Sequence, residues 1–274
     1  MDLNAIFGVS GKVALVTGGG TGIGRMVVEA LAMGGARVLT CSRKLPAVEA
    51  AAAEVNALGY DGSVEAFQGD VSSEAGIDAI VAEVRARTGH LNILINNAGI
   101  TWGAPMGSFP HQAWEKVMNV NVAAVFHLTQ SLLPDLKAAA SDADPARVVN
   151  LSSVMGVRPM GDGAYSYAAS KAAVAHLTQI MAKELAADQI TVNAFAPGPF
   201  KSKMTAFATG SDAQSEKVGA DVPLGRVGAP EDIAGATLFL CGRGGAYTTG
   251  EIVPLCGGIH VMTAPNIFRA AMGG

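Results

Sequence analysis

The sequence predicts an α/β fold in which a single domain is built on a doubly wound parallel sheet. Short apolar runs alternate with longer amphipathic ones along nearly the whole chain, as expected where strands and helices take turns. With 274 residues, the chain fits one large α/β domain better than two small ones. Half of the residues are hydrophobic and only 15% are charged, which suits helices packed on both faces of a sheet.

Each strand is expected where a short apolar run lies between turn residues, and each helix where apolar residues recur at helical spacing. The expected strands are residues 13–16, 37–41, 64–68, 92–95, 147–151, 190–195 and 251–254. The expected helices are residues 23–33, ended by Gly34-Gly35, 46–58, opened by Pro46, 74–88, 113–137, 165–187 and 231–240. Right-handed crossovers between such strands make the sheet parallel.

Two segments stand outside this pattern. Residues 197–226 show no clear element, and long loops at strand ends of such sheets often carry function. Residues 1–274 are treated as one domain, with 261–274 as a C-terminal tail that either packs on a neighbouring subunit or is disordered.

The composition argues against several classes of protein. The net charge is −4 without a basic block, so neither nucleic acid nor a membrane is an expected partner. Cys41, Cys241 and Cys256 lack Cys-x-x-Cys spacing, which is typical of a reduced cytoplasmic protein. The five histidines are scattered, so no metal site is expected.

A glycine-rich turn follows the first strand and opens the first long helix, with glycines at Gly18, Gly22 and Gly24. Such a turn lets the backbone approach a pyrophosphate, whose charge is favoured by the helix N-terminus. The spacing differs from the strict Gly-x-Gly-x-x-Gly pattern, and a turn of this kind can also simply connect two elements. Its place at the first strand favours a Rossmann-type dinucleotide site.

The end of the second strand bears on the choice of cofactor. Ser42, Arg43 and Lys44 stand where an acid would accept the adenosine ribose hydroxyl and repel a 2′-phosphate. The guanidinium of Arg43 can instead clamp that phosphate, so we expect NADP(H) rather than NAD(H). Asp70 follows the third strand and is a candidate to bind the adenine amino group; it could equally be an N-terminal helix acid.

Tyr167 and Lys171 are four residues apart in an expected helix and therefore share a face. A free tyrosine has a pKa near 10, and a nearby ammonium lowers it. We expect Lys171 to act in this way, together with the charge of an oxidised nicotinamide. Tyr167 would then give a proton to a ketone or take one from an alcohol. Such a pair is common on helices, and by itself it can be packing alone.

Taken together, these motifs resemble the short-chain dehydrogenase/reductase family, over about Lys12 to Gly258. The motifs that carry the resemblance occur in the family's order: Thr17 to Gly24, Asn96 to Gly99, Asn121, Ser153, Tyr167 to Lys171 and Pro197-Gly198. Within the family, three segments are similar to 3-oxoacyl reductases associated with rhamnolipid synthesis: Thr101 to Ala104, Trp114 to Met118 and Ala164 to Tyr167.

The resemblance implies roles for individual residues. The catalytic set would be Asn121, Ser153, Tyr167 and Lys171. Ser153 would hydrogen-bond the substrate oxygen, Lys171 would also bind the nicotinamide ribose, and Asn121 would hold a water that links Lys171 to solvent. The cofactor would also contact Gly18, Thr21, Gly22, Ile23, Gly24, Ser42, Arg43, Lys44, Asp70, Val71, Asn97, Ala98, Gly99, Pro197, Gly198, Phe200 and Ser202.

The chain departs from the family pattern in two places. The interval from Ser153 to Tyr167 is about one residue longer than usual, so Ser152 stays a rival for the catalytic hydroxyl. Cys256 stands where the family often has the aspartate of Asp-Gly-Gly, which puts a packing or subunit contact in question. Tyr165 is excluded as the catalytic phenol because Ala169, four residues on, has no amine.

Large apolar residues from loops beyond the strand ends are expected to form a substrate pocket: Trp102, Met155, Met160, Phe200, Met204 and Phe207. Methionine side chains re-pack easily, so the pocket would favour a fatty or bulky ketone over a sugar. Ordinary loop packing is the alternative for each residue.

The expected substrate also depends on charge near the mouth of the pocket. Asp144 and Asp188 occupy positions where fatty-acid-synthesis reductases have arginines that flank the mouth. They would repel an acidic carrier protein, so a CoA thioester or a free ketone is expected at least equally.

Three functions stay open at this point. The first is an NADP-dependent 3-oxoacyl-type reductase, the second a dehydrogenase of a steroid, terpenoid or other cyclic alcohol, and the third a dinucleotide-sensing protein without activity. Family members are mostly tetramers, so the resemblance implies a homo-oligomer, with a dimer as the alternative.

Overall fold

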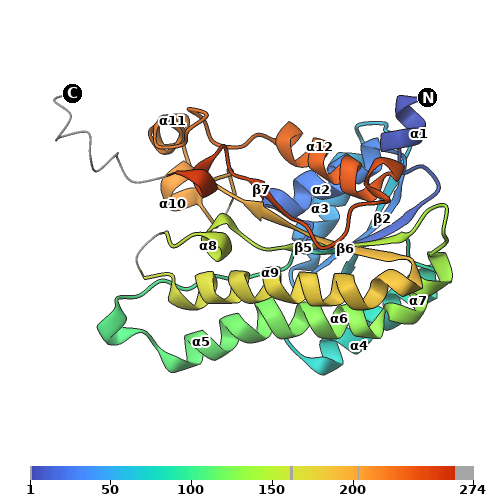
Figure 1. The fold of residues 1–274 in the computed structure, drawn as a ribbon, viewed down its shortest axis with the longest axis horizontal. Coiled ribbons are helices and arrows are strands. Elements are labelled where there is room, and N and C mark those ends of the chain that lie inside the picture. Colours follow the sequence, from blue (N-terminus) through green and yellow to red (C-terminus); the bar gives the residue numbers. More distant parts are fainter. Residues whose placement is uncertain (1, 161–162, 203, 263–274) are drawn as a thin grey trace.

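A computed structural model describes residues 2–160, 163–202 and 204–262, and it contains a seven-stranded parallel sheet between two layers of helices (Figure 1). The strand order is β3-β2-β1-β4-β5-β6-β7. The strands are β1 (Val13–Thr17), β2 (Arg37–Ser42), β3 (Ser63–Gln68), β4 (Ile93–Asn96), β5 (Ala146–Leu151), β6 (Ile190–Pro197) and β7 (Ile252–Leu255). The prediction of a doubly wound parallel sheet is confirmed.

The two helix layers bury separate faces of the sheet. The long helices are α2 (Gly22–Met33), α3 (Leu45–Asn56) and α12 (Pro230–Cys241) on one face, and α4 (Glu74–Arg87), α6 (Ala124–Ser131) and α9 (Tyr165–Leu185) on the other (Figure 1). Strand order reverses between β1 and β4, and parallel sheets bind ligands in the crevice that opens at this point, beyond the carboxyl ends of the strands.

The single helix predicted over residues 113–137 is wrong in detail. It is divided into α5 (His111–Met118), a π-helical turn η2 (Asn119–Ala123), α6 and α7 (Leu133–Ala139). Pro134 lies in the first turn of α7, because proline cannot donate the hydrogen bond that a helix interior needs. The π turn contains no proline, and Asn121 within it is buried.

The segment 197–226, predicted to lack regular structure, contains α10 (Ala206–Thr209) and α11 (Asp212–Ala220). A capping box begins α11. The backbone amide of Gln214 donates to Ser211 Oγ at 3.3 Å, and the side-chain oxygen Oε1 of Gln214 accepts from the backbone amide of Ser211 at 3.1 Å. The Ser-x-x-Gln spacing is a sequence signal for a helix start and could have revealed α11.

Two other short helices are new: α1 (Leu3–Phe7) and α8 (Val154–Val157). Near the end of the chain, Ile259–Val261 form a 3₁₀ turn. The rest of the expected tail, residues 263–274, lies outside the described residues.

A buried arginine ties the start of β5 to the end of α12. Arg147 is almost completely buried and donates to the carbonyls of Leu240 and Gly242, each at 3.1 Å, and to Asp144 Oδ1 at 3.0 Å. Lys12 forms a second ion pair with Asp144. Burial lowers the pKa of Arg147, and the Asp144 carboxylate works against that shift.

We expect Arg147→Met to lower the free energy of unfolding by about 3–5 kcal/mol, since it leaves buried carbonyls without a donor. Urea denaturation followed by circular dichroism measures this loss. Arg243→Met, at an exposed arginine that directly follows Gly242, serves as the control and should stay close to wild type. A loss in Arg147→Met no larger than in the control would contradict the assigned role.

Candidate active site

A cavity of about 1020 Å³ lies at the carboxyl ends of the strands. Its walls come from the ends of β1, β2, β4, β5 and β6, and from the segment that follows β6. All the predicted cofactor residues line it: Gly18, Thr21, Gly22, Ile23, Gly24, Ser42, Arg43, Lys44, Asp70, Val71, Asn97, Ala98, Gly99, Tyr167, Lys171, Pro197, Gly198, Phe200 and Ser202. The fold therefore brings together segments nearly 200 residues apart.

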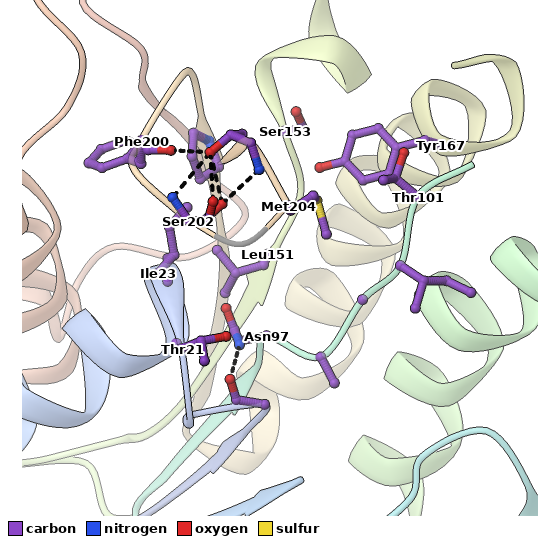
Figure 2. A pocket seen from close by; sticks show the side chains of 18 of the residues that line it. Thr21, Ile23, Asn97, Thr101, Leu151, Ser153, Tyr167, Phe200, Ser202 and Met204 are labelled. Carbon is purple, nitrogen blue, oxygen red and sulfur yellow. Dashed lines mark hydrogen bonds between the residues drawn. The ribbon is translucent and has the colours of Figure 1, made fainter. Parts of the chain in front are cut away.

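The glycine-rich turn packs too closely to tolerate side chains at two positions. Gly22 has φ +57°, and a Cβ there would lie 2.9 Å from Cβ of Ser202. A Cβ on Gly24 would lie 2.3 Å from Nδ2 of Asn97, which itself donates to the Thr17 carbonyl at 2.8 Å (Figure 2). The backbone of the turn thus borders the cavity directly, at the N-terminus of α2, where free amides favour an anion.

Beside the glycine-rich turn, at the end of the neighbouring strand, the turn after β2 is held by its own hydrogen bonds. Ser42 Oγ donates to the Lys44 carbonyl at 3.1 Å, and Gln68 Nε2 donates to the Arg43 carbonyl at 3.3 Å. The side chains of Arg43 and Lys44 are exposed beside the cavity. Asp70 lines the cavity and accepts from the Ser72 backbone amide at 2.9 Å in the turn before α4. It is not the N-terminal acid of that helix, since Ser73 caps α4 and Glu74 lies in its first turn.

Three predicted catalytic side chains meet at one wall of the cavity. Ser153 follows β5 and Tyr167 lies in the first turn of α9, and Figure 2 shows both hydroxyl groups with Met204 beside them. Lys171 Nζ lies 5.6 Å from the centre of the Tyr167 ring and donates to the Leu151 carbonyl at 2.5 Å. Lys171 is only 5% exposed.

The acidification of the phenol expected from Lys171 and an oxidised nicotinamide together stays a prediction for the cofactor complex; in the protein by itself the pKa shift of Tyr167 has the opposite direction. Burial raises the pKa of Tyr167, and only the Ser153 hydroxyl works in the opposite direction. Burial also lowers the pKa of Lys171 to about 8. The reason is that the fold places both groups where water cannot stabilise their charged forms, an effect that spacing along a helix does not reveal.

Asn121 lies behind the cavity wall. Its Oδ1 accepts from the Ile100 amide and its Nδ2 donates to the Ile100 carbonyl, both at 2.9 Å. Ser152, the rival for the catalytic hydroxyl, donates to the Lys171 carbonyl at 2.8 Å. Because that bond commits the Ser152 hydroxyl to the backbone of α9, Ser153 has the better position for catalysis.

The predicted substrate residues fall into two groups. Met155, Met160, Met204 and Phe207 line the cavity, although Phe207 is 85% exposed. Trp102 is not among the described residues of the lining and is 46% exposed, whereas its neighbour Thr101 lines the cavity; a substrate contact by Trp102 stays a prediction.

Sequence reasoning missed part of the wall that comes from α10, α11 and the end of the described chain. These residues are Ala208, Thr209, Val218, Asp221, Val222, Ile259 and Met262. Cys256 supports this region from behind: it packs with Val154, Val222 and Ile259, and its Sγ lies 3.2 Å from Nδ1 of His260.

The position predicted for Asp144 and Asp188 is also wrong. Both precede a strand, β5 and β6 respectively, and so lie at the edge of the sheet opposite the cavity. Asp188 pairs with Lys137 at 2.8 Å, and Asp144 pairs with Lys12 and Arg147. In this subunit, these carboxylates do not flank the mouth and give no argument against a carrier-bound substrate.

A parallel sheet with a glycine-rich turn after β1 and a Ser-Tyr-Lys set beside the cavity defines a nucleotide-dependent oxidoreductase. Residues 12–212 match the family described as short chain dehydrogenase, and the chain belongs to this family.

Its relatives and structural neighbours cover almost the whole chain. One relative, the rhamnolipids biosynthesis 3-oxoacyl-[acyl-carrier-protein] reductase of Pseudomonas aeruginosa, is 43% identical over 94% of this chain and 100% of its own. A tropinone reductase homologue of Arabidopsis thaliana is 36% identical over 99% of both chains. The structure of the Pseudomonas aeruginosa RhlG/NADP active-site complex matches with a TM-score of 0.89 and 43% identity, over 93% of this chain and 99% of that one.

The described residues contain no helix that combines the length and the apolar character needed to cross a bilayer.

Proposed function

We propose that this protein is an NADP(H)-dependent oxidoreductase that interconverts a hydrophobic ketone and a secondary alcohol, with a 3-oxoacyl thioester as the preferred ketone. The observation that carries the proposal is the meeting of Ser153, Tyr167 and Lys171 at one wall of a large cavity that the glycine-rich turn also lines. The two relatives named above, a 3-oxoacyl reductase and a homologue of a ketone reductase, support it.

The cavity fits a dinucleotide phosphate along its length. The amides after Gly22 would hold the pyrophosphate, Arg43 and Lys44 would hold the 2′-phosphate, and Lys171 the nicotinamide ribose. Pro197, Gly198, Phe200 and Ser202 would border the nicotinamide, and Asp70 the adenine. When bound, the cofactor supplies or accepts the hydride.

The protein's own residues supply the proton that the ketone oxygen takes up on reduction. A raised pKa keeps the Tyr167 phenol protonated at neutral pH, which is the form that donates a proton to a ketone oxygen. Ser153 would hydrogen-bond the same oxygen and stabilise the charge that develops on it. Asn121 acts behind them, between α9 and the loop after β4.

The substrate end of the cavity is apolar, with Met155, Met160, Met204 and Phe207 along it. The test is turnover with NADPH or NADH against 3-oxoacyl thioesters, cyclic ketones and steroids. We expect the fastest reduction with a 3-oxoacyl thioester. Faster reduction of a steroid or cyclic ketone would show that this ketone, and not a 3-oxoacyl thioester, is the preferred substrate. Tight NADPH binding without any turnover would favour a dinucleotide sensor over an enzyme.

We expect Arg43→Ala to raise the Michaelis constant for NADPH by about 10–100-fold, the value of a lost charge-assisted hydrogen bond, and to leave that for NADH nearly unchanged. Initial rates at varied cofactor concentration measure both constants. Arg243→Ala, at an exposed arginine outside the cavity lining, is the control. Equal effects of Arg43→Ala on the two cofactors would overturn the preference for NADPH.

We further propose that the protein is a cytoplasmic homo-oligomer, with a tetramer favoured over a dimer, and that residues 1–274 act as one domain. Exposed apolar side chains on three helices of one layer support the oligomer: Trp114 on α5, Phe126 on α6 and Ile180 on α9. Light scattering on the purified protein gives the subunit number, and a monomer at micromolar concentration would contradict the proposal.

A further inference from the structure

The side chain of Asn121 connects two segments that border the catalytic wall. On one side it makes two hydrogen bonds to the backbone of Ile100, in the loop that lines the cavity after β4. On the other side its Nδ2 donates to Ser170 Oγ in α9 at 2.9 Å. The amide group thus uses its oxygen and both of its N–H donors.

The Ser170 hydroxyl continues this connection into the turn that carries the phenol. Ser170 is fully buried, and its Oγ donates to the backbone carbonyl of Tyr167 at 2.7 Å. Because the single hydroxyl proton goes to that carbonyl, the oxygen must accept from Asn121. The direction of every hydrogen bond from Ile100 to Tyr167 is therefore determined.

We propose that Ser170 is a positioning residue that sets the Tyr167 phenol relative to the loop after β4. This inference rests on the function proposed above for Tyr167. The loop includes Asn97, Ala98 and Gly99, which line the cavity, and a Cβ on Gly99 would lie 3.3 Å from Asn121 Oδ1 and 3.6 Å from Lys171 Nζ. Because the hydrogen bonds through Ser170 and Asn121 hold α9 at a fixed distance from this loop, they also fix the position of the Tyr167 phenol at the cavity wall.

The same helix offers a matched control, two turns farther along. Thr178 Oγ1 donates to the Val174 carbonyl at 2.8 Å and accepts from Asn150 Nδ2 at 2.9 Å. It is a buried hydroxyl between a helix carbonyl and an asparagine amide, as Ser170 is, but its asparagine belongs to β5 and bonds to Asn96 at the end of β4 rather than to the backbone of Ile100.

The first test measures hydride transfer in a single turnover, with enzyme in excess over NADPH and the ketone that wild type reduces fastest. We expect Ser170→Ala to slow the transfer by about 10–100-fold, since small misplacements of reacting groups have effects of this size. NADPH affinity, measured by fluorescence, should stay close to wild type. Thr178→Ala should lower stability without a comparable change in the transfer rate.

Ser170→Cys is a second variant, because a thiol fills the site but donates only weakly. Its rate of hydride transfer should lie between those of wild type and Ser170→Ala. If Ser170→Ala does not fold, Ser170→Cys is compared with wild type in its place. A transfer rate near wild type in the Ser170 variants would overturn the inference, and so would an equal loss in Thr178→Ala.

The second test does not depend on turnover. Hydrogen–deuterium exchange followed by mass spectrometry should show faster exchange in Ser170→Ala at residues 97–101 and 165–171 together. Thr178→Ala should leave residues 97–101 unchanged. If wild type reduces no ketone, the proposed function fails, while this experiment still decides the role of Ser170: unchanged exchange in both segments would refute it.

Discussion

Tyr167→Phe is expected to lower kcat by about 10²–10⁴-fold, the contribution of a well-placed general acid. The substitution removes only the hydroxyl, whose raised pKa keeps it protonated and ready to donate at neutral pH. The affinity for NADPH should remain near that of wild type, because the ring stays in the first turn of α9. Steady-state rates and fluorescence titration with NADPH measure the two effects.

Tyr165→Phe is the matched control for this prediction. Tyr165 lies in the same turn of α9, but its ring packs on Phe109, with centroids 5.8 Å apart, and it is not among the described residues that line the cavity. It should retain most of the activity. If both variants were equally active, or if Tyr167→Phe kept its turnover, Tyr167 would not be the proton donor.

Lys171→Met is expected to abolish turnover and at the same time to stabilise the protein without cofactor. Burial lowers the pKa of Lys171 to about 8, well below that of a lysine in an unfolded chain. A difference of about 2.5 pKa units corresponds to at most about 3 kcal/mol that the buried charge costs the fold. In the variant, the Leu151 carbonyl loses its hydrogen-bond donor, which offsets part of the stability gained by removing the charge. We therefore expect the free energy of unfolding of Lys171→Met to exceed that of wild type by about 1–2 kcal/mol at pH 7.

The pH dependence of this gain follows from the direction of the shift. Below pH 8, folded and unfolded chains both carry the ammonium, and the cost is fully present. As the pH rises through 8 towards 10.5, the folded protein loses the proton first, so wild type gains stability relative to the variant. The advantage of Lys171→Met should therefore shrink over this range.

Urea denaturation at pH 7 and pH 10 measures the difference between wild type and Lys171→Met. Lys183→Met, at an exposed lysine of the same helix, is the control and should show neither the gain nor its pH dependence. A Lys171→Met variant less stable than wild type at pH 7 would show that the ammonium is better stabilised than its burial implies.

Local patterns in the sequence were enough to predict the sheet and the chemistry of the site. The apolar runs at β1 and β4, the glycine-rich turn and the Tyr167-Lys171 pair each depend on residues close together in the chain. Segments with weaker local patterns were predicted less well. The capping box of α11 was overlooked, and the π turn around Asn121 has no periodicity that separates it from an α-helix.

What the sequence determined by itself is therefore the parallel sheet, the cavity at its carboxyl edge, and the residues of the strand ends and the glycine-rich turn that face it. Only the tertiary structure decided the direction of the pKa shifts of Tyr167 and Lys171, the hydrogen bond from Ser152 to the α9 backbone, and the place of Asp144 away from the cavity. The physical reason is that periodicity and turn chemistry act over a few residues, whereas burial and hydrogen-bond partners depend on segments that meet only in the folded chain.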